Sequence, residues 1–224
     1  MVKVSILLPT AHRPKSVLRA LNCVFSQETK YSWELFFAGD NAPYFEEIVT
    51  SETFLEQKRK AEEAGNKVHI WNNPESCGSP GVIINQAIQR ANSEYFMFYA
   101  DDDFIHKNHI ENYVSAIDGT DNDMMYFSAK IVSGKDGTPV SYRNTVLQSS
   151  RIGHSELVVK TDVLKKAPAH NDSYGHDWDL INWFITTHKK CVRSNNDPTY
   201  VVCVHKAGGF KGEPSDPWNW KLDV

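Results

Sequence analysis

The sequence predicts a single α/β domain in which helices flank a mixed, mostly parallel central sheet. Short apolar segments alternate with amphipathic segments along the first half of the chain, and this order favours parallel strands joined by right-handed crossovers. The apolar segments are continuous, as expected for strands covered on both faces. The length of 224 residues allows one large core, and no change in composition marks a second domain.

The first strand is expected over residues 4–8, a short and almost entirely apolar run. Pro14 then suits the first turn of a helix, and apolar residues recur at helical spacing over 17–25. Residues 34–38 form a second apolar run that ends at the polar residues 40–41. These features predict one complete strand–helix–strand unit at the start of the chain.

A polar helix is expected over residues 45–64, with Gly65 as its stop. Residues 67–71 predict a third strand. The pair at 79–80 is a serine followed by a proline, which is typical of a helix N-cap and the first helical position. The next strand is expected over 95–100, so the alternation of strands and helices continues to that point.

The second half of the chain has a less regular pattern. The expected elements there are a helix over 110–117, a strand over 124–132, a hairpin turn at 134–137, a short strand over 157–159, a helix over 177–187 and a strand over 200–204. From Lys206 onward the chain is rich in glycine, proline and tryptophan, which suggests a loop that closes over a site.

The strand at 95–100 is followed at once by Asp101, Asp102 and Asp103. Three neighbouring carboxylates repel one another, so a divalent cation that neutralises them would explain their position. In open α/β sheets, ligands bind at the carboxyl ends of the strands. The alternative is a solvated turn in which an aspartate caps the following helix. The three residues taken alone support both interpretations equally.

His106 and His109 follow closely, and a helix would place them on one face. A metal-binding pair is one interpretation, but no third ligand lies near them in the sequence. We therefore expect them to be solvated polar residues.

The composition excludes several classes of protein. Hydrophobic residues make up 41% of the chain, which can therefore build a core, and the formal charge of −4 provides no basic footprint for nucleic acid. The N-terminus is broken too early by proline to be a signal peptide, and no apolar run approaches the roughly 20 residues of a membrane span. The four cysteines show no paired or metal-like spacing, so we expect reduced thiols and a cytoplasmic protein.

Five segments, in this order and spacing, resemble the family 2 glycosyltransferases of the GT-A fold, and in pattern the bacterial spore-coat polysaccharide type. The segments are residues 4–10 (VSILLPT), 33–41 (WELFFAGDN), 84–88 (INQAI), 94–103 (EYFMFYADDD) and 175–180 (GHDWDL). Similarity extends with gaps over nearly all of the first 205 residues. The resemblance implies a Rossmann-like fold with a nucleotide-binding half (1–104), an acceptor-binding half (105–205) and a C-terminal loop or lid (206–224).

The resemblance also implies how a UDP-sugar donor would bind. Pro9, Thr10 and Ala11 would line the nucleotide pocket, and Asp40 would accept a hydrogen bond from uracil N3–H. Many members carry two acids at the second of these segments, where this chain has glycine before Asp40. Many also carry an arginine in the loop before the Asn85 helix. This chain has none there, so Arg13 or backbone N–H groups would replace it at the diphosphate.

The acidic segment would be the Asp-x-Asp metal motif of the family, with Mn²⁺ or Mg²⁺ as the cation. If the motif is extended, Asp101 and Asp103 project to one side. Asp103 is the preferred direct ligand, and Asp101 or Asp102 would reach the ribose. His205, at the end of the last strand, is placed to complete the metal or diphosphate site. A divalent cation bound by one or two carboxylates, phosphate oxygens and water fits this short motif.

The implied reaction transfers the sugar to an acceptor hydroxyl with inversion at the anomeric carbon. Asp177 would be the general base that takes the acceptor's proton. Asp179 is the alternative, although helical spacing aims it away from Asp177. The acceptor could be a glycan, a protein, a small molecule or a modified nucleobase, and the sequence specifies neither the sugar nor the oligomeric state.

Three other functions compete with this one. A nucleotidyltransferase that acts on sugar phosphates would carry a basic, glycine-rich loop after the first strand, and residues 9–14 are not such a loop. A non-catalytic nucleotide- or glycan-binding protein of the same fold has no need of both Asp103 and Asp177. A dinucleotide-binding dehydrogenase would carry a Gly-x-Gly-x-x-Gly motif, which is absent after the first strand.

Overall fold

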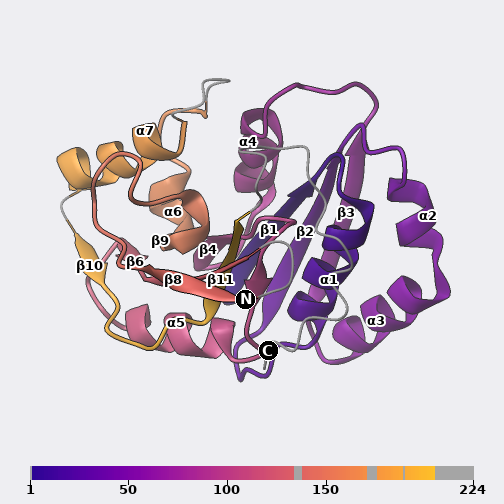
Figure 1. Cartoon of the computed structure of the whole chain (residues 1–224), viewed down its shortest axis with the longest axis horizontal. Helices are drawn as coiled ribbons and strands as arrows, with labels where there is room; N and C mark the ends of the chain where they lie inside the picture. Colours follow the sequence, from indigo (N-terminus) through magenta and orange to yellow (C-terminus); the bar gives the residue numbers. More distant parts are fainter. Residues whose placement is uncertain (1, 134–137, 171–175, 189, 205–224) are drawn as a thin grey trace.

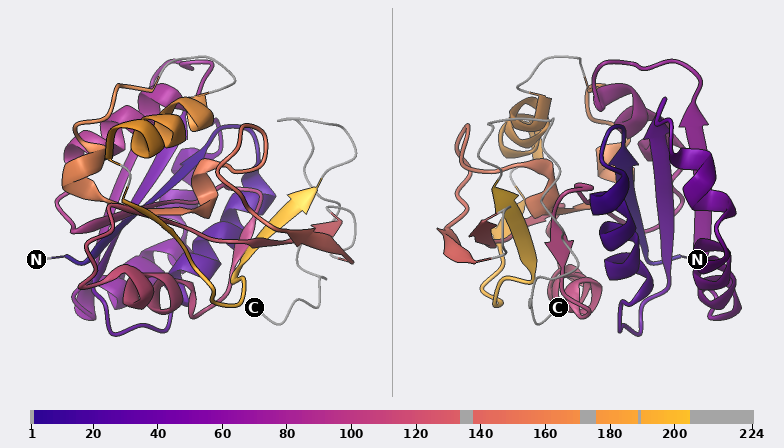
Figure 2. Two further views of the ribbon diagram at one scale, coloured as in Figure 1. Left: turned by 90° about the vertical axis from the view of Figure 1, so that its left-hand side faces the viewer. Right: turned by 45° about the vertical axis from the view of Figure 1, so that its right-hand side comes forward.

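The computed structural model describes residues 2–133, 138–170, 176–188 and 190–204 (Figure 1). Within them the chain forms a seven-stranded sheet, a smaller four-stranded sheet and helices on both faces of the larger sheet (Figures 1 and 2). The predicted hairpin turn at 134–137, His205 and the tail from 206 onward lie outside the described residues. None of the described helices combines the length and apolar character needed to cross a bilayer.

The larger sheet is mostly parallel, as predicted. Its strands, in spatial order, are β10 (Cys191–Arg193), β6 (Met124–Tyr126), β9 (Leu157–Lys160), β4 (Tyr95–Phe98), β1 (Val4–Thr10), β2 (Trp33–Asp40) and β3 (Lys67–Asn73). β9 alone runs antiparallel to its neighbours. β1 lies between β2 and β4, with Leu7 paired to Phe36 on one side and to Phe98 on the other. The carboxyl ends of these three strands therefore meet at one edge.

Helices cover both faces of this sheet and bury two apolar layers. α1 (Pro14–Phe25), α2 (Phe45–Thr50), α3 (Glu52–Glu63) and α5 (His109–Ile117) pack on one face, and α4 (Gly81–Arg90), α6 (Thr161–Leu164) and α7 (His176–Trp183) on the other. Along β1, Ile6 and Leu8 face the first layer and Leu7 the second. This two-sided burial is why the strands are continuous apolar runs.

The smaller sheet contains β5 (Phe104–Ile105), β11 (Tyr200–Val204), β7 (Ala129–Ser133) and β8 (Pro139–Arg143), in that order, and stands to one side of the larger one (Figure 2). The predicted single strand over 124–132 is therefore wrong, because β6 belongs to the larger sheet and β7 to the smaller. Apolar residues of both sheets share one core, to which Ala129 and Tyr200 contribute. The two sheets thus form one folding unit.

The predicted helix over 45–64 is also two helices. Ser51 separates them, with an extended ψ of 143° and a side-chain oxygen that accepts a hydrogen bond from the Phe54 N–H at 3.3 Å. A serine in this position caps the second helix better than it continues the first. Gly65 does end α3 as predicted, since its φ of +86° lies in the left-handed region that favours glycine.

The predicted helix over 177–187 begins at His176 as α7 and continues as a π-helical segment, η2 (Phe184–His188). The apolar residues of both parts pack on the larger sheet. Trp178 and Trp183 are among the residues packed there, so they serve the core.

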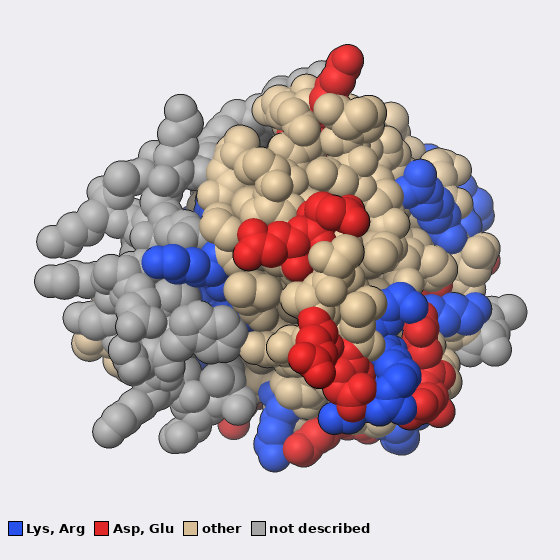
Figure 3. Space-filling view, turned by 90° about the vertical axis from the view of Figure 1, so that its right-hand side faces the viewer, with Lys and Arg blue, Asp and Glu red and all other residues tan. Residues whose placement is uncertain are grey.

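Charged side chains are interspersed on the face over α2 and α3 (Figure 3). Arg59 bridges Glu56 and Glu63, and Lys58 pairs with Glu62. Among the described residues of these two helices, the basic side chains are therefore paired with acidic ones.

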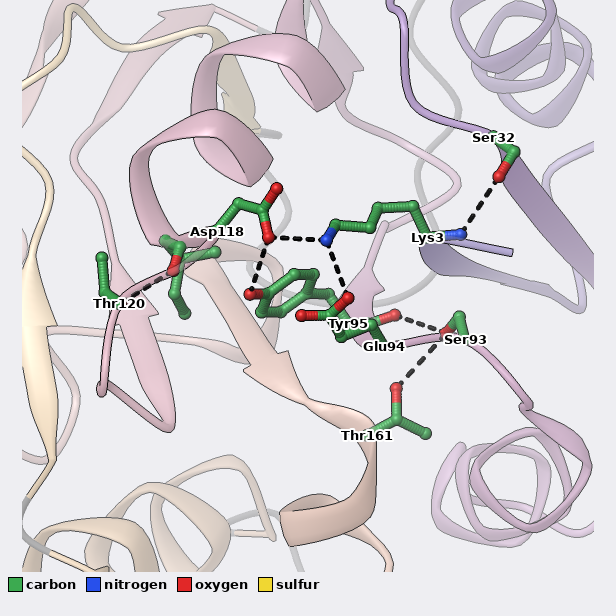
Figure 4. A network of polar contacts seen from close by, with 9 residues as sticks. Lys3, Ser32, Ser93, Glu94, Tyr95, Asp118, Thr120 and Thr161 are labelled. Atoms are coloured by element: carbon green, nitrogen blue, oxygen red, sulfur yellow. Dashed lines mark hydrogen bonds and ion pairs between the residues drawn. The ribbon is translucent and has the colours of Figure 1, made fainter. Parts of the chain in front are cut away.

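A polar network joins the amino-terminal ends of β1 and β4 to the end of α5 (Figure 4). Lys3 Nζ lies 2.7 Å from Glu94 Oε2 and 2.5 Å from Asp118 Oδ1, and the Tyr95 hydroxyl is 3.5 Å from the same Asp118 oxygen. This edge is opposite to the carboxyl ends of the strands. The network therefore stabilises the sheet without bearing on a ligand site.

His109 is buried at the start of α5, which contradicts the expectation that it is solvated. Only 3% of its surface is exposed, its Nδ1 lies 2.9 Å from the Thr199 hydroxyl oxygen, and its ring meets Tyr113 and Phe127 edge-on. His106 precedes the helix, so the two residues do not share a helical face. Burial lowers the pKa of His109 from 6.5 to about 3.

We expect acid to destabilise the fold through His109. The unfolded chain takes up a proton at this residue near pH 6.5, whereas the native protein does so only near pH 3. The free energy of unfolding therefore falls as the pH drops below 6.5, by at most about 1.4 kcal/mol per pH unit.

Urea unfolding of the wild type and of His109→Asn measures this effect. Between pH 6.5 and pH 5 the variant should lose about 2 kcal/mol less stability than the wild type, because asparagine cannot be protonated. The other titrating groups are common to both proteins and cancel in the difference. Equal losses in the two proteins would contradict the prediction.

Candidate functional site

Polar residues from three strand ends gather at the carboxyl edge of β1, β2 and β4. Thr10 ends β1 and donates a hydrogen bond to Asp101 Oδ2 at 2.8 Å. The Thr10 hydroxyl also lies 2.6 Å from the Tyr44 hydroxyl, which in turn accepts a hydrogen bond from the Arg13 N–H. Pro9 and Ala11, on either side of Thr10, are half-buried at this edge. The structure thus brings together the residues predicted to line a nucleotide pocket.

The Arg13 guanidinium lies between two of the three acids. One of its nitrogens is 2.6 Å from Asp101 Oδ1 and the other 3.2 Å from Asp102 Oδ2. Asp101 is almost wholly buried, and this burial raises its pKa to about 6 although the Arg13 charge acts in the opposite direction. Arg13 is therefore a counter-ion inside the acidic segment.

The carboxylate of Asp103 has different partners, which both lie in β11 of the smaller sheet. Its Oδ2 accepts a hydrogen bond from the Tyr200 hydroxyl at 2.6 Å, and its Oδ1 accepts one from the Cys203 N–H at 2.8 Å. Only 7% of its surface is exposed. Burial, together with repulsion from Asp102, raises the pKa of Asp103 to about 8. The last acid of the motif joins β4 to β11.

The acidic segment is a turn, closed by a hydrogen bond from the Asp103 N–H to the Ala100 carbonyl at 3.3 Å. The motif is therefore not extended, and the condition under which Asp101 and Asp103 would project to one side is not met. The alternative of a helix cap fails as well, because β5 follows the acids and α5 begins only at His109.

The donor set of the turn consists of carboxylate oxygens, which hard divalent cations prefer. Within the described residues no three histidine, cysteine or acidic side chains are arranged to enclose a metal ion. A cation that takes one or two carboxylates and completes its shell with phosphate oxygens and water fits such a set. His205, the other predicted ligand, lies outside the described residues.

Asp40 ends β2 and organises the loop before α4. Its Oδ1 accepts a hydrogen bond from the Cys77 N–H at 2.7 Å, and its Oδ2 accepts one from the Ser76 hydroxyl at 2.9 Å. Each carboxylate oxygen has a second lone pair, so Asp40 retains acceptor capacity. Asp40 thus lies one strand away from Thr10, with its carboxylate at the carboxyl edge.

A close approach of the backbone explains why glycine precedes Asp40. A Cβ on Gly39 would clash with the Asn72 amide and come within 2.8 Å of the Phe45 ring. The Asn72 side chain is fixed by two hydrogen bonds to the backbone of Ala42, at 3.0 and 3.1 Å. A second acid at position 39 therefore has no room.

We expect Gly39→Ala to lower the free energy of unfolding by about 1–3 kcal/mol, as over-packing does elsewhere. Urea denaturation of Gly39→Ala, Asn72→Ala and the double variant measures the effect. The double variant should lose less than the sum of the single losses, because removal of the Asn72 side chain relieves part of the clash. Additive losses would show that the contact does not determine the residue at position 39.

Asp177 lies in the first turn of α7, and 39% of its side chain is exposed. Its Oδ1 is 2.8 Å from His154 Nδ1. The His154 ring is stacked on Phe98, the last residue of β4, with centroids 4.7 Å apart. Asp177 and the acidic turn are therefore linked to the end of the same strand. Asp179, the alternative base, is exposed.

Three residues of this region were not predicted: Tyr44, Tyr200 and His154. Each reaches the site from a segment distant in sequence, so no local pattern points to its role. A tyrosine hydroxyl that meets a polar group far away in the sequence, as Tyr44 meets Thr10 and Tyr200 meets Asp103, leaves no periodic signal. His154 also gave none, because its partner Asp177 is 23 residues away.

Comparison with known proteins identifies the relatives of this chain. Residues 5–212 match the family model described as glycosyl transferase family 2. The chain is 26% identical over 185 residues to the poly(ribitol-phosphate) beta-N-acetylglucosaminyltransferase TarS of Staphylococcus aureus strain MW2. That alignment covers 78% of this chain and 30% of TarS, so the chain spans about a third of the relative's length.

Solved structures show the same fold. The crystal structure of S. aureus TarS 1–349 in complex with UDP matches with a TM-score of 0.69 at 21% identity, over 91% of this chain and 61% of that one. The mannosyltransferase PcManGT from Pyrobaculum calidifontis, in complex with GDP-Man and Mn²⁺, matches with a TM-score of 0.63 at 14% identity, over 92% and 58%. The predicted mixed, mostly parallel GT-A architecture is confirmed.

Proposed function

Since the chain belongs to glycosyltransferase family 2, we propose that it transfers a sugar from a UDP-sugar to an acceptor hydroxyl in a metal-dependent, inverting reaction. One observation carries the proposal. The acidic turn at residues 101–103 and the carboxylate of Asp177 are both attached to the end of β4, the first directly and the second through His154. A sheet end of this kind is where ligands bind in open α/β folds.

The donor is proposed to be UDP-linked. TarS has been solved with UDP and with UDP-GlcNAc, and it shares the fold of this chain. Asp40 would accept the uracil N3–H, while Pro9, Thr10 and Ala11 would line the pocket beside it. Arg13 would meet the diphosphate, since its guanidinium already lies at this edge between Asp101 and Asp102. The name of the relative makes N-acetylglucosamine the first sugar to test.

The metal is proposed to be Mn²⁺ or Mg²⁺. Asp103 and His205 would hold it, with Asp101 or Asp102 directed to the ribose. The lone pairs of Asp103 that Tyr200 and Cys203 leave unused are the ones available to the cation. When bound, the cation supplies a Lewis acid that stabilises the negative charge of the leaving diphosphate.

Asp177 is proposed as the general base. The acceptor oxygen forms a bond to the anomeric carbon as the bond from that carbon to the diphosphate oxygen breaks. The acceptor's proton goes to Asp177, and UDP leaves with the bonding electron pair. Attack opposite to the leaving group inverts the configuration. The partial exposure of Asp177 allows an acceptor hydroxyl to reach it.

The remaining assignments are proposed together with this reaction. Residues 1–104 would bind the donor and 105–205 the acceptor, with 206–224 as a loop or lid. The acceptor is one of the four classes named above, and the poly(ribitol-phosphate) named for the relative makes a hydroxyl-rich polymer the first to test. The protein is proposed to act in the cytoplasm.

A two-step assay tests the proposal. UDP with Mn²⁺ should raise the melting temperature more than UDP alone, because Asp103 would hold the cation and the cation would offset the negative charge of the diphosphate. UDP-GlcNAc, UDP-GalNAc, UDP-glucose and UDP-galactose should then be screened for slow sugar release, with EDTA as the control. Absence of both a UDP-dependent shift and any EDTA-sensitive release would overturn the assignment.

A further inference from the structure

A chain of hydrogen-bonding side chains leads from Asp177 into the core. His154 Nδ1 faces Asp177 Oδ1 at 2.8 Å, and His154 Nε2 faces His170 Nε2 at 3.1 Å. His170 is held by Asn85, whose Oδ1 accepts the backbone N–H of His170 at 2.9 Å and lies 3.4 Å from its Nδ1, and whose Nδ2 donates to the His170 carbonyl at 3.0 Å. Both histidines are buried, so Asp177 is the solvent-facing end of this chain.

His154 is held rigidly in this position. Its ring is stacked on Phe98 at 4.7 Å, with the ring planes 21° apart. It begins a short 3₁₀ helix, η1 (His154–Glu156), which the buried Glu156 secures. Glu156 accepts hydrogen bonds from the Gly153 N–H at 2.9 Å and the Thr145 hydroxyl at 2.6 Å. The position of the imidazole is therefore set by the fold, independently of Asp177.

The backbone beside His154 also accommodates the Asp177 carboxylate. The His154 N–H points to Asp177 Oδ2 at 3.4 Å, so both oxygens face donors from one residue. A Cβ on Gly153 would lie 3.3 Å from the same Oδ2. Glycine at 153 leaves the space that the carboxylate occupies.

The two imidazoles constrain each other's protons. Between the two Nε2 atoms, one nitrogen must donate and the other accept. If His154 carries its proton on Nδ1 and donates it to the Asp177 carboxylate, its Nε2 is an acceptor, and His170 donates from its own Nε2. The His170 Nδ1 lies 3.4 Å from Asn85 Oδ1, which is also an acceptor, so in this arrangement His170 carries a proton on both ring nitrogens. The partner of one ring nitrogen thereby determines the tautomer of the other, as second-shell groups do for catalytic histidines and metal ligands.

We propose that His154 is a positioning residue for Asp177 and that His170 fixes the His154 tautomer that makes it one. The inference rests on the proposed function, because it takes Asp177 as the base. An N–H donated to the ionised carboxylate favours that form and holds it in one orientation. The arrangement reverses the roles in a Ser-His-Asp triad, where a carboxylate orients an imidazole base.

Two variants at position 154 separate positioning from packing. His154→Phe keeps a ring against Phe98 but removes the donor, and we expect kcat for sugar transfer to fall at least about tenfold, with the KM for the UDP-sugar within about twofold of the wild type. His154→Asn places an amide nitrogen close to the position of Nδ1 and should recover kcat to within about threefold. A purely structural role predicts the opposite order, because phenylalanine replaces the ring better.

Two further variants test the contributions of His170 and Asp177, the two partners of His154. His170→Phe removes the partner of Nε2 and should lower kcat by less than His154→Phe does. In Asp177→Asn the base is already lost, so adding His154→Phe should cost no more. Losses that simply multiply would show that His154 acts independently of Asp177.

The proton positions can be measured without turnover. Long-range ¹H–¹⁵N spectra of the wild type, assigned with the His154→Asn variant, should show His154 protonated at Nδ1. A His154 protonated at Nε2 alone would overturn the inference. If the wild type transfers or releases no sugar, the proposed function fails, and the catalytic meaning of His154 with it. If the wild type is active and His154→Phe is equally active, only the inference fails.

Discussion

Asp177→Asn is expected to lower kcat for sugar transfer by about 10²–10⁴-fold, the range over which a general base contributes. The amide is nearly isosteric with the carboxylate but cannot accept the acceptor's proton. Binding of UDP with Mn²⁺ should be unchanged, because Asp177 is bound to His154 in η1 and is not one of the residues proposed to hold the donor or the cation. Initial rates with a UDP-sugar and calorimetric titration with UDP and Mn²⁺ measure the two effects separately.

Asp179→Asn is the matched control for this prediction. Asp179 lies two residues further along α7 and is exposed, so the substitution removes the same charge from the same helix turn. It should leave kcat within about twofold of the wild type, as expected of a surface residue without a catalytic role. A large loss in Asp179→Asn together with a small loss in Asp177→Asn would reassign the base to Asp179.

Asp103→Asn should abolish the dependence of UDP binding on metal. Loss of residues that only support a metal ligand typically lowers metal affinity 10–100-fold, so loss of a direct ligand should cost about 100-fold or more. UDP affinity in the presence of Mn²⁺ should then fall to its value in EDTA. Titrations of UDP at fixed Mn²⁺, with and without EDTA, measure this difference.

Tyr200→Phe serves as the comparison, since it removes the 2.6 Å hydrogen bond to Asp103 and leaves the carboxylate in place. It should destabilise the protein by about 1–3 kcal/mol, because a buried acceptor loses a partner, but keep metal-dependent UDP binding. If Asp103→Asn instead behaves like Tyr200→Phe, Asp103 is a structural link to β11 and the cation is held by Asp101 and Asp102.

Much of the fold could be predicted from local patterns. Continuous apolar runs identified β1, β2 and β4, and Gly65 marked the end of α3, because burial on both faces and a left-handed backbone leave signatures within a few residues. The break between β6 and β7 left no such local signature. Both strands are apolar, and their assignment to different sheets depends on pairing with β9 and β11, which lie far away in the sequence.

In the candidate site too, features with a local sequence signal could be predicted, and features that depend on distant residues could not. The positions of the acidic turn and of Asp40 could be predicted because a polar residue at the end of a buried strand is itself the signal, whereas their proposed roles come from the resemblance to the family. The orientation of the Asp103 side chain could not be predicted, since it depends on the Tyr200 hydroxyl, which is 97 residues away. His109 shows the converse, because a polar side chain at the start of an amphipathic helix gave no sign that Thr199 receives it in the core.

The two hydrogen bonds from Asp103 to β11 also bear on the order in which the parts of the molecule fold. They join residues 97 and 100 positions apart, so the acidic turn acquires its native geometry only after the last described strand has docked. Contacts of such long range form late, since closing the intervening loop costs entropy first. A chain still emerging from the ribosome could therefore complete its first strands and helices without a finished acidic turn. Competence to hold the cation would then arrive only after residue 203 has been made and β11 has docked.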